Sequence, residues 1–429
     1  MTPLENPARP ARPSNVPYVS RLPKRRLLTV AAATAVTLVS VPVLPAVADD
    51  ATQCTFPSKP YAGRPWSLQR VLLDELWSRS TGKGVRVAVI DTGVDVRNPQ
   101  LKKAVDTSAG INLMDKGIKD ENGEPIPRGK ENGTTDTVGH GTRVAGIIAA
   151  REAEGTGFVG LAPDATIIPI QQNDAEGHGT AKTLAAAIDY AVDTAHADVI
   201  NISQDTANAV EPEAALRRAV DHALAAEVVV VASAGNDGLD ATDKKTYPAS
   251  YPGVLAVASS DRNNERAGFS QTGDWVGVAA PGVDMVSTVP AGGHCADNGT
   301  SFSAPYVAGV AALIKARHPE WEQEEVVAQI EQTAERSVAG RDRLVGWGVV
   351  DPVRALTEDD KPVKEPAARE GMTRAEAPTP AELTLGETAE ERDARLATYV
   401  VVGALVLVAA IAGVAVALRD ARRRRVSGA

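Results

Sequence analysis

Short valine-rich runs alternate with longer alanine- and leucine-rich runs between residues 78 and 356, and this order constrains the fold more than any other feature. Brief β-branched runs are typical of buried strands. They are Val85–Ile90, Thr166–Ile170, Asp198–Ile202 and Val228–Ala232. The runs Ala181–Ala195 and Glu213–Ala225 have the length and composition of helices. Strand–helix–strand alternation predicts an α/β domain with a mostly parallel central sheet and helices on both faces.

Reactive side chains occur where the predicted strands end and helices begin, which is where active sites form in such sheets. Asp91 follows the first apolar run, in the segment VIDTGVD (89–95). His140 lies between two glycines and before a helical run, in DTVGHGTRVAG (136–146). Each residue alone has an ordinary explanation, because an aspartate at a strand end is usually a turn residue. The histidine is equally compatible with a metal ligand or with a tolerated surface position.

A serine completes the set of reactive residues. Ser301, in NGTSFSAP (298–305), precedes an apolar helix expected from about Tyr306 to Arg317, a position typical of a helix cap. Together with Asp91 and His140 it supplies a nucleophile, a base and an orienting carboxylate. A histidine can take the serine proton at neutral pH and return it to a leaving amine. A buried carboxylate fixes the histidine tautomer and stabilises the imidazolium.

The three segments resemble the signature motifs of the subtilisin-like serine proteases (family S8), in that family's order of Asp, His and Ser. The resemblance covers about residues 80–356 and includes GWGVVD (346–351), which is similar to the family's C-terminal end. It implies a subtilisin-like α/β fold, polypeptide substrates and a catalytic triad of Asp91, His140 and Ser301. No cofactor is expected.

A fourth segment, VVVASAGND (229–237), reads as a strand that runs into a Gly-Asn turn. In the subtilisin family the asparagine at this position donates its side-chain amide to the oxyanion. The resemblance therefore implies this role for Asn236, with the backbone N–H of Ser301 as the second donor. Without the triad, a left-handed turn residue would be the favoured interpretation of Asn236.

The chain departs from the secreted subtilisins at several positions. Arg143 stands where they commonly have histidine, and Ser203-Gln204-Asp205 stands where they commonly have Ser-Leu-Gly in the substrate-binding strand. Because that strand is expected to pair with an extended peptide, Asp205 would place a charge beside the substrate. His178 is expected on a loop that borders the cleft, where a simple surface histidine is the alternative.

The N-terminus predicts a secretory signal peptide over residues 1–48. A basic segment ends at Arg26, an apolar run follows at Leu27–Leu44, and Ala46–Ala48 forms a small-x-small cleavage pattern. The alternative is a retained membrane anchor. Prolines within and just after the apolar run disfavour that alternative, since a continuous spanning helix tolerates them poorly.

The C-terminus predicts a transmembrane helix over residues 398–418, because this run carries no charge and is long enough to cross a hydrocarbon core. A soluble core helix is the alternative, but it leaves the following arginines unexplained. Basic residues favour the cytoplasmic side, so residues 419–429 are predicted to be a cytoplasmic tail. The preceding domain is then extracytoplasmic. Residues 357–397 are rich in Pro, Ala and Glu and predict an exposed stalk.

Residues 49–77 form an N-terminal extension before the predicted protease domain (78–356). The chain has two cysteines, Cys54 and Cys295, and an exported domain lies where disulfides persist. We therefore predict a Cys54–Cys295 disulfide, with two free thiols as the alternative. The extension is too short to be a chaperone propeptide like those of many subtilisins. We expect it to wrap the domain and to be retained.

A formal net charge of −10 disfavours nucleic acid as a partner, because phosphate binding needs a concentrated positive surface. No metal site is assigned. An acidic cluster precedes His140, for which a solvated loop is favoured over a calcium site. It consists of Asp115, Asp120, Glu121 and Glu124.

The order of signal peptide, subtilisin-like domain, Pro-rich stalk, single membrane helix and basic tail resembles the mycosins, the membrane-bound proteases of type VII secretion systems. The segment 136–146 and the long insertion at about 106–135 fit that group. The resemblance implies a cell-membrane protease that associates with type VII secretion membrane components and helps to keep them intact. Two alternatives stay open: a scaffold in which proteolysis is secondary, and a stand-alone surface protease.

Overall fold

The computed structural model describes residues 54–117, 119, 123–124, 128–174, 179–204, 214–240, 244–368 and 389–426. The predicted signal peptide (1–48) lies outside the described residues, as do His178, Asp205 and residues 369–388 of the predicted stalk.

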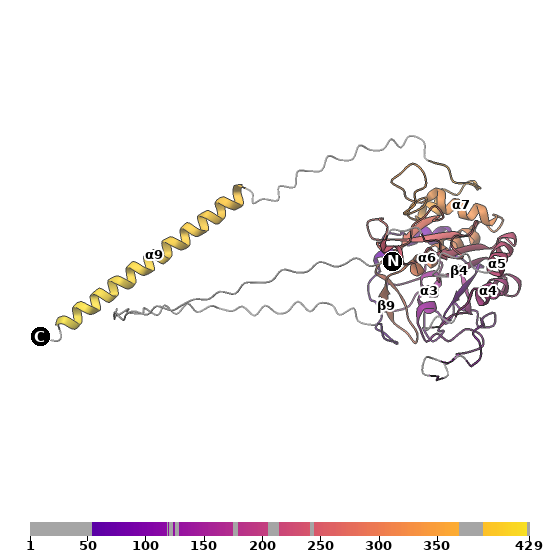
Figure 1. Cartoon of the computed structure of the whole chain (residues 1–429), viewed down its shortest axis with the longest axis horizontal. Helices are drawn as coiled ribbons and strands as arrows, with labels where there is room; N and C mark the ends of the chain where they lie inside the picture. The colour runs from indigo at the N-terminus through magenta and orange to yellow at the C-terminus, as the bar shows by residue number, and fades with distance from the viewer. Residues whose placement is uncertain are drawn as a thin grey trace, which may run out of the picture. The chain divides into compact units, whose positions relative to one another are not determined.

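Parallel strands lie at the centre of the domain, β4 among them (Figure 1). The seven strands of this sheet follow the order β2-β3-β1-β4-β5-β6-β7. They are β1 (Arg86–Asp91), β2 (Ile111–Asn112), β3 (Thr166–Gln171), β4 (Val199–Ile202), β5 (Val229–Ser233), β6 (Leu255–Ser260) and β7 (Val278–Pro281). The four strands expected from the sequence are present, each shifted by at most one residue at either end. Since the strands are parallel, their carboxyl ends lie at one edge of the sheet.

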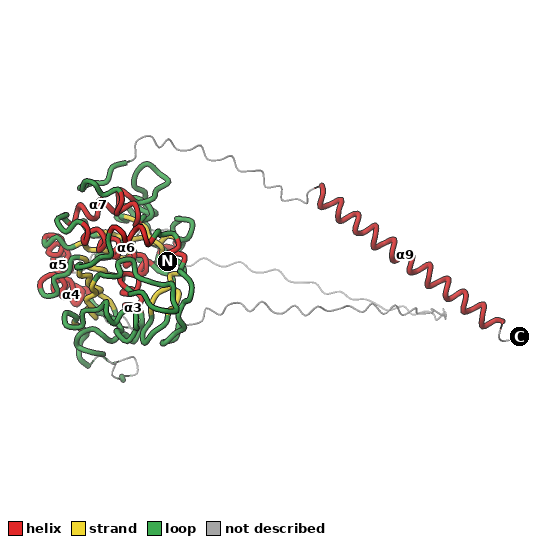
Figure 2. The backbone as a smooth tube through the Cα atoms, turned by 180° about the vertical axis from the view of Figure 1, so that it is seen from behind, coloured by secondary structure: helices red, strands yellow, loops and turns green. Residues whose placement is uncertain are grey.

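Helices cover both faces of this sheet, as Figure 2 shows with strands in the interior of the domain and helices around them. Alternate residues of a strand face opposite sides. Val87 and Val89 of β1 belong to the core formed with α3 (His140–Ala149) and α6 (Thr300–Arg317). Ala88 and Ile90 belong to the core formed with α4 (Ala181–Asp193) and α5 (Ala214–Ala225). The predicted α/β architecture is therefore confirmed.

Helix α6 begins earlier than the sequence suggested. The expected start at about Tyr306 is wrong, because α6 runs from Thr300 and contains Pro305. A proline inside a helix removes one backbone hydrogen bond and costs about 3 kcal/mol or more. Here the first fifteen residues of α6, 300–314, are all buried. Burial of this central helix outweighs the local penalty, so Ser301 lies within the first turn of α6.

A two-stranded antiparallel hairpin, β8 (Met285–Thr288) and β9 (His294–Asp297), precedes α6. Two further helices, α7 (Gln323–Thr333) and α8 (Pro352–Thr357), follow α6. Asp351 caps α8 by accepting hydrogen bonds from the backbone N–H groups of Val353 and Arg354. The hairpin matters for the site, because β9 leads within a few residues into the segment that carries Ser301.

Two short helices, α1 (Trp66–Gln69) and α2 (Leu73–Arg79), lie before β1. Leu68, Leu73 and Leu76 are buried in the same core as α3 and α6. The predicted boundary between extension and domain at residues 77 and 78 stays a prediction, and α2 runs across it.

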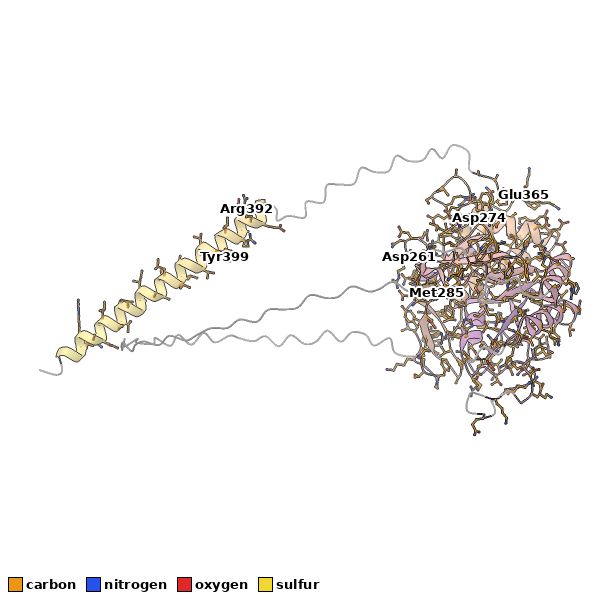
Figure 3. The ribbon with its side chains drawn as sticks, viewed as in Figure 1. Asp261, Asp274, Met285, Glu365, Arg392 and Tyr399 are labelled. Atoms are coloured by element: carbon orange, nitrogen blue, oxygen red, sulfur yellow. A yellow bond between two sulfur atoms is a disulfide. The ribbon has the colours of Figure 1, made fainter. Side chains whose placement is uncertain are left out.

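One helix in the described part of the chain, α9 (Ala389–Val426), is long and apolar enough to cross a membrane, over Glu391–Arg423. It contains the predicted span 398–418. Its apolar side chains are exposed, among them Tyr399, labelled in Figure 3. An exposed apolar helix of this length is a candidate for a membrane span, because a soluble core helix would bury those side chains.

Candidate active site

Asp91 lies at the carboxyl end of β1, which pairs with β3 on one side and β4 on the other. Its side chain is buried, with only 2% of it exposed. The backbone N–H of Thr92 donates to Asp91 Oδ1 over 2.8 Å. A carboxylate that is held by a neighbouring amide and by a strand paired on both sides has a fixed orientation.

His140 is the first residue of α3 and faces Asp91. Its Nδ1 lies 2.8 Å from Asp91 Oδ1 and 3.0 Å from Oδ2. Because an ionised carboxylate only accepts hydrogen bonds, Nδ1 carries the proton and Nε2 is left with its lone pair. Burial lowers the pKa of His140, but the charge of Asp91 and its hydrogen bond raise it to above its ordinary value overall. Such an imidazole can accept a proton from a hydroxyl group.

Two glycines allow α3 to begin this close to β1. Gly139 has a φ of 83°, in the left-handed region that glycine adopts without strain. A Cβ on Gly141 would lie 2.2 Å from the carbonyl oxygen of Gly93 and 3.1 Å from Asp91 Oδ1. Glycine is therefore required at both positions that flank His140, which explains the Gly-His-Gly pattern.

Ser301 lies in the first turn of α6 with 9% of its surface exposed. The ring of Phe302, its neighbour in α6, is 5.4 Å from the imidazole of His140 between centroids. This contact places the start of α6 beside the start of α3, and therefore the hydroxyl-bearing segment beside the histidine. The structure thus brings Asp91, His140 and the Ser301 segment together at the carboxyl edge of the sheet.

Asn236 lies on the turn after β5, and its amide is oriented by Thr300. Its Oδ1 accepts hydrogen bonds from Thr300 N (2.9 Å) and Thr300 Oγ1 (3.0 Å). The Nδ2 group must then point away from Thr300. A Cβ placed on Gly299 would lie 3.0 Å from Ser301 Oγ and 3.6 Å from Asn236 Nδ2. The hydroxyl and the amide donor therefore border one small space, which the absent side chain of Gly299 keeps open.

Arg143, a departure from the secreted subtilisins, connects α3 to the hairpin of β8 and β9. Its guanidinium pairs with Asp297 and lies over the ring of Phe302, 6.0 Å from the centroid. Its side chain is 10% exposed. Arg143 therefore helps to hold α3, which begins at His140, against the segment that leads from β9 to Ser301.

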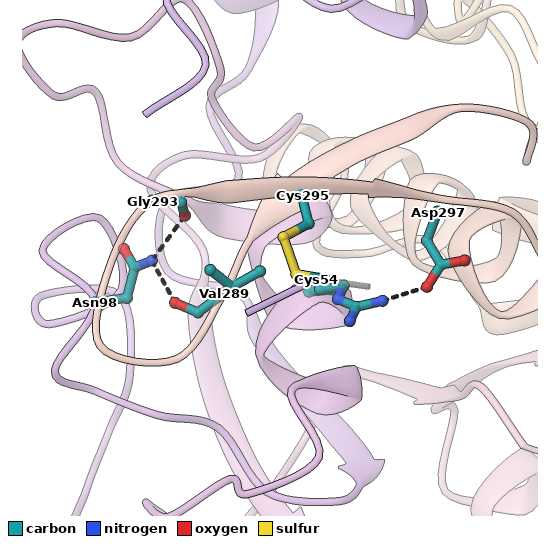
Figure 4. Close-up of a disulfide and its surroundings, with 7 residues drawn as sticks. Cys54, Asn98, Val289, Gly293, Cys295 and Asp297 are labelled. Atoms are coloured by element: carbon teal, nitrogen blue, oxygen red, sulfur yellow. Dashed lines mark hydrogen bonds and ion pairs between the residues drawn. A yellow bond between two sulfur atoms is a disulfide. The ribbon is translucent and has the colours of Figure 1, made fainter. Parts of the chain in front are cut away.

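The N-terminal strap, which we define as residues 54–64, crosses this region of the surface. A disulfide joins Cys54 to Cys295 in β9, with their Cα atoms 6.0 Å apart (Figure 4). Next to it in Figure 4, Asp297 pairs with an arginine guanidinium. A Cβ on Gly139 would lie 2.3 Å from the ring of Phe56, so this ring rests on the turn before His140. Sequence reasoning missed this contact, because no pattern links positions so far apart.

Further hydrogen bonds attach the strap to the hairpin of β8 and β9. Ser58 N donates to Gly292 O (3.0 Å), and His294 N donates to Lys59 O (3.1 Å). Tyr61 N donates to His294 Nδ1 (3.0 Å). The strap thus follows the hairpin rather than the central sheet.

Among the described residues, no group of three or more His, Cys, Asp or Glu side chains is arranged to hold a metal ion. Asp120 and Glu121 of the predicted acidic cluster lie outside those residues.

Comparison with known proteins agrees with this geometry. Residues 82–348 match the subtilase family of S8 peptidases. This chain belongs to the subtilase family. Subtilisin BL of Lederbergia lenta is 34% identical over 288 residues, which cover 67% of this chain and 96% of that protein. The chain is accordingly a subtilisin-like serine protease by descent.

Solved structures of mycosins are also similar. The MycP3 protease from the type VII (ESX-3) secretion system is 33% identical, covers 71% of this chain and 90% of that one, and has a TM-score of 0.59. MycP1 from Mycobacterium smegmatis is 30% identical, covers 76% of this chain and 92% of that one, and has a TM-score of 0.61. The resemblance to mycosins, which was predicted from the order of segments along the chain, is confirmed.

Proposed function

We propose that this subtilase is a membrane-anchored endopeptidase of a type VII secretion system, with Asp91, His140 and Ser301 as its catalytic triad. The hydrogen-bonded Asp91–His140 pair beside the first turn of α6 carries this proposal. That arrangement supplies a base with its free nitrogen available and a nucleophile-bearing helix next to it.

In the proposed reaction, Ser301 Oγ attacks the carbonyl carbon of the scissile peptide bond while His140 Nε2 takes its proton. Asn236 Nδ2 and the backbone N–H of Ser301 donate to the oxyanion that forms. His140 then returns the proton to the leaving amine, which yields an acyl-enzyme. Water, deprotonated by His140, hydrolyses that ester and regenerates the serine. Asp91 keeps the imidazole in the required tautomer throughout.

The proposed cellular setting follows from the ends of the chain. We assign residues 1–48 as a signal peptide, residues 398–418 of α9 as the membrane-spanning segment and residues 419–429 as a cytoplasmic tail. The protease domain is then extracytoplasmic, where the Cys54–Cys295 disulfide persists. Fusion of alkaline phosphatase and, separately, green fluorescent protein after residue 429 tests the sidedness. Fluorescence without phosphatase activity is expected, and active phosphatase would contradict it.

Association with secretion components is proposed from the mycosin likeness together with this anchored architecture. A structural role in the secretion complex is the second candidate, supported by a strap and an anchor helix that the chemistry of the triad does not need. Ser301→Ala separates the two roles when substrate processing and secretion are measured in the same cells. Lost processing with normal secretion would mean separable roles, whereas processing that persists would refute the triad.

Ser303→Ala is the matched control for that experiment. Ser303 lies in the same helix, but its Oγ contacts Ser259 Oγ (2.9 Å) and donates to Ala280 O (3.0 Å), away from the histidine. We expect this variant to retain processing. Loss of processing in both variants would indicate damage to α6 rather than removal of a nucleophile.

A further inference from the structure

A second buried carboxylate lies behind the Asp91–His140 pair and has no role in the proposed reaction. Asp136 is only 2% exposed, four residues before His140. Its Oδ1 accepts hydrogen bonds from Val138 N (3.1 Å) and Gly139 N (2.7 Å). Its Oδ2 accepts from Thr142 N (2.9 Å) and Thr142 Oγ1 (2.6 Å). One side chain therefore holds the turn before His140 and the first turn of α3 after it.

The same carboxylate reaches the strand that carries Asp91. Thr92 Oγ1 donates to Asp136 Oδ1 over 3.0 Å and accepts from Gly141 N over 3.0 Å. Thr92 directly follows Asp91, and Gly141 directly follows His140. The two triad members are thus joined a second time, through their chain neighbours, by a network that centres on Asp136.

We propose that Asp136 is the positioning residue of the triad, locking the His140 turn onto the strand end that carries Asp91. The proposal rests on the catalytic assignment made above and adds to it a group that touches neither substrate nor the reacting atoms. Five donors point at one carboxylate, which is more than a helix cap needs. A buried, fully hydrogen-bonded charge of this kind fixes geometry, because any displacement leaves it without partners.

The charge of Asp136 also acts on the base. Burial raises the pKa of Asp136 to about 6, although hydrogen bonds from Thr142 and Gly139 oppose this. Above that pH the carboxylate is ionised and raises the pKa of His140, while Arg143 lowers it. The charged groups that bear on His140 are therefore Asp91 on β1, Asp136 before α3, and Arg143 on α3.

Asp136→Asn in the full-length chain tests the proposal. Asparagine cannot accept all five hydrogen bonds and carries no charge. We expect the plateau of kcat/KM for a chromogenic peptide to fall by about tenfold to a hundredfold, mainly through kcat. The acid limb of the pH profile should move to lower pH by about one unit, because a negative charge that favours the imidazolium is removed. A purely structural defect would lower the rate without moving that limb.

Asp164→Asn is the control with the same change of charge. Asp164 lies just before β3, at the amino edge of the sheet, and pairs with Arg151 on the surface. We expect its pH profile to match that of the parent chain. The proposal is overturned if Asp136→Asn behaves like Asp164→Asn, or if the rate falls while the acid limb stays in place.

Thr92→Val keeps the test decisive if Asp136→Asn does not fold. It retains the charge of Asp136 and removes the link to Asp91, so kcat should fall while KM changes little. A kcat equal to that of the parent chain would overturn the proposal.

Covalent labelling of the unmodified chain with a fluorophosphonate distinguishes failure of the proposed function from failure of the role of Asp136. If that chain neither cleaves peptide nor reacts, the proposed function fails. If the unmodified chain cleaves peptide and reacts with the fluorophosphonate, and the variants have the same kcat and pH profile, only the proposed role of Asp136 fails.

Discussion

The carboxyl edge of the sheet and the N-terminal strap both contact the turn just before His140, but they are built in different ways. Asp91 ends a strand that is paired on both sides, and Asp136 binds its neighbours through five hydrogen bonds. The strap is held by one disulfide, a few backbone hydrogen bonds and one histidine. Changes at the edge should therefore alter the chemistry, whereas changes in the strap should alter stability.

Asp91→Asn should produce the largest effect. An asparagine can direct an N–H toward Nδ1 of His140, which favours the tautomer whose Nε2 is protonated and cannot act as a base. We expect kcat to fall by about 10⁴-fold, with the midpoint of thermal unfolding nearly unchanged. Steady-state kinetics and thermal melts of the same preparation check this. A loss of less than tenfold would mean that the edge is not the catalytic centre.

Asn236→Ala should have the next largest effect. It removes the donor that borders the space beside Ser301, and kcat should fall by about 10²–10³ with little change in KM. Asn263→Ala, on an exposed turn, is the control and should leave the kinetics unaltered. Equal kinetics for the two variants would show that Asn236 only shapes its turn.

Removal of the disulfide tests the other half of the comparison. Cys54 and Cys295 are 241 positions apart in the sequence, so replacement of both by serine removes a long-range covalent link. We expect the free energy of unfolding to fall by about 2–5 kcal/mol, with kcat at low temperature close to that of the parent. Denaturant unfolding and kinetics on one sample measure both. A collapse of kcat with unchanged stability would contradict the separation between edge and strap.

His294 gives the smallest of the four expected effects. Burial lowers its pKa to about 4 from the ordinary value of 6.5. Its Nδ1 accepts from Tyr61 N, so the proton lies on Nε2, which donates to Gln100 Oε1 over 2.7 Å. Between these two pKa values the unfolded chain binds more protons than the folded one. The contribution of neutral His294 to the free energy of unfolding is therefore fully present above about pH 6.5 and is lost as the pH drops toward about 4.

The expected loss over that pH window is about 1–3 kcal/mol. His294→Gln can keep both hydrogen bonds but does not titrate, so its stability should depend less steeply on pH than that of the parent. Urea unfolding at several pH values compares the two chains. Parallel pH dependences would show that the strap is not attached through a neutral His294.

Much of the fold could be predicted, and the candidate catalytic residues could be named, because local patterns encode them. Valine- and isoleucine-rich runs gave β1, β3, β4 and β5 within one residue. By contrast, β6 and β7 contain Ala, Ser and Pro and lack that signal. The start of α6 at Thr300 rather than at about Tyr306 could not be predicted, since the burial that compensates for Pro305 is a tertiary effect.

The residues that sequence reasoning missed act across long separations. Asp136 begins the segment 136–146, but its hydrogen-bond partner Thr92 is 44 positions away, so their contact is visible only in the folded chain. The packing of Phe56 on Gly139 depends on the path of the strap, which no periodicity records. Local sequence predicts which side chains can react, whereas tertiary structure determines which ones hold them in place.

The most direct test of the central claim is the site at which a fluorophosphonate attaches to the full-length chain at neutral pH. Peptide mass mapping identifies the modified residue. We expect a single adduct on Ser301 that is lost in Asp91→Asn and retained in Ser303→Ala. An adduct on a different residue, or labelling that is independent of Asp91, would contradict the assignment of the triad.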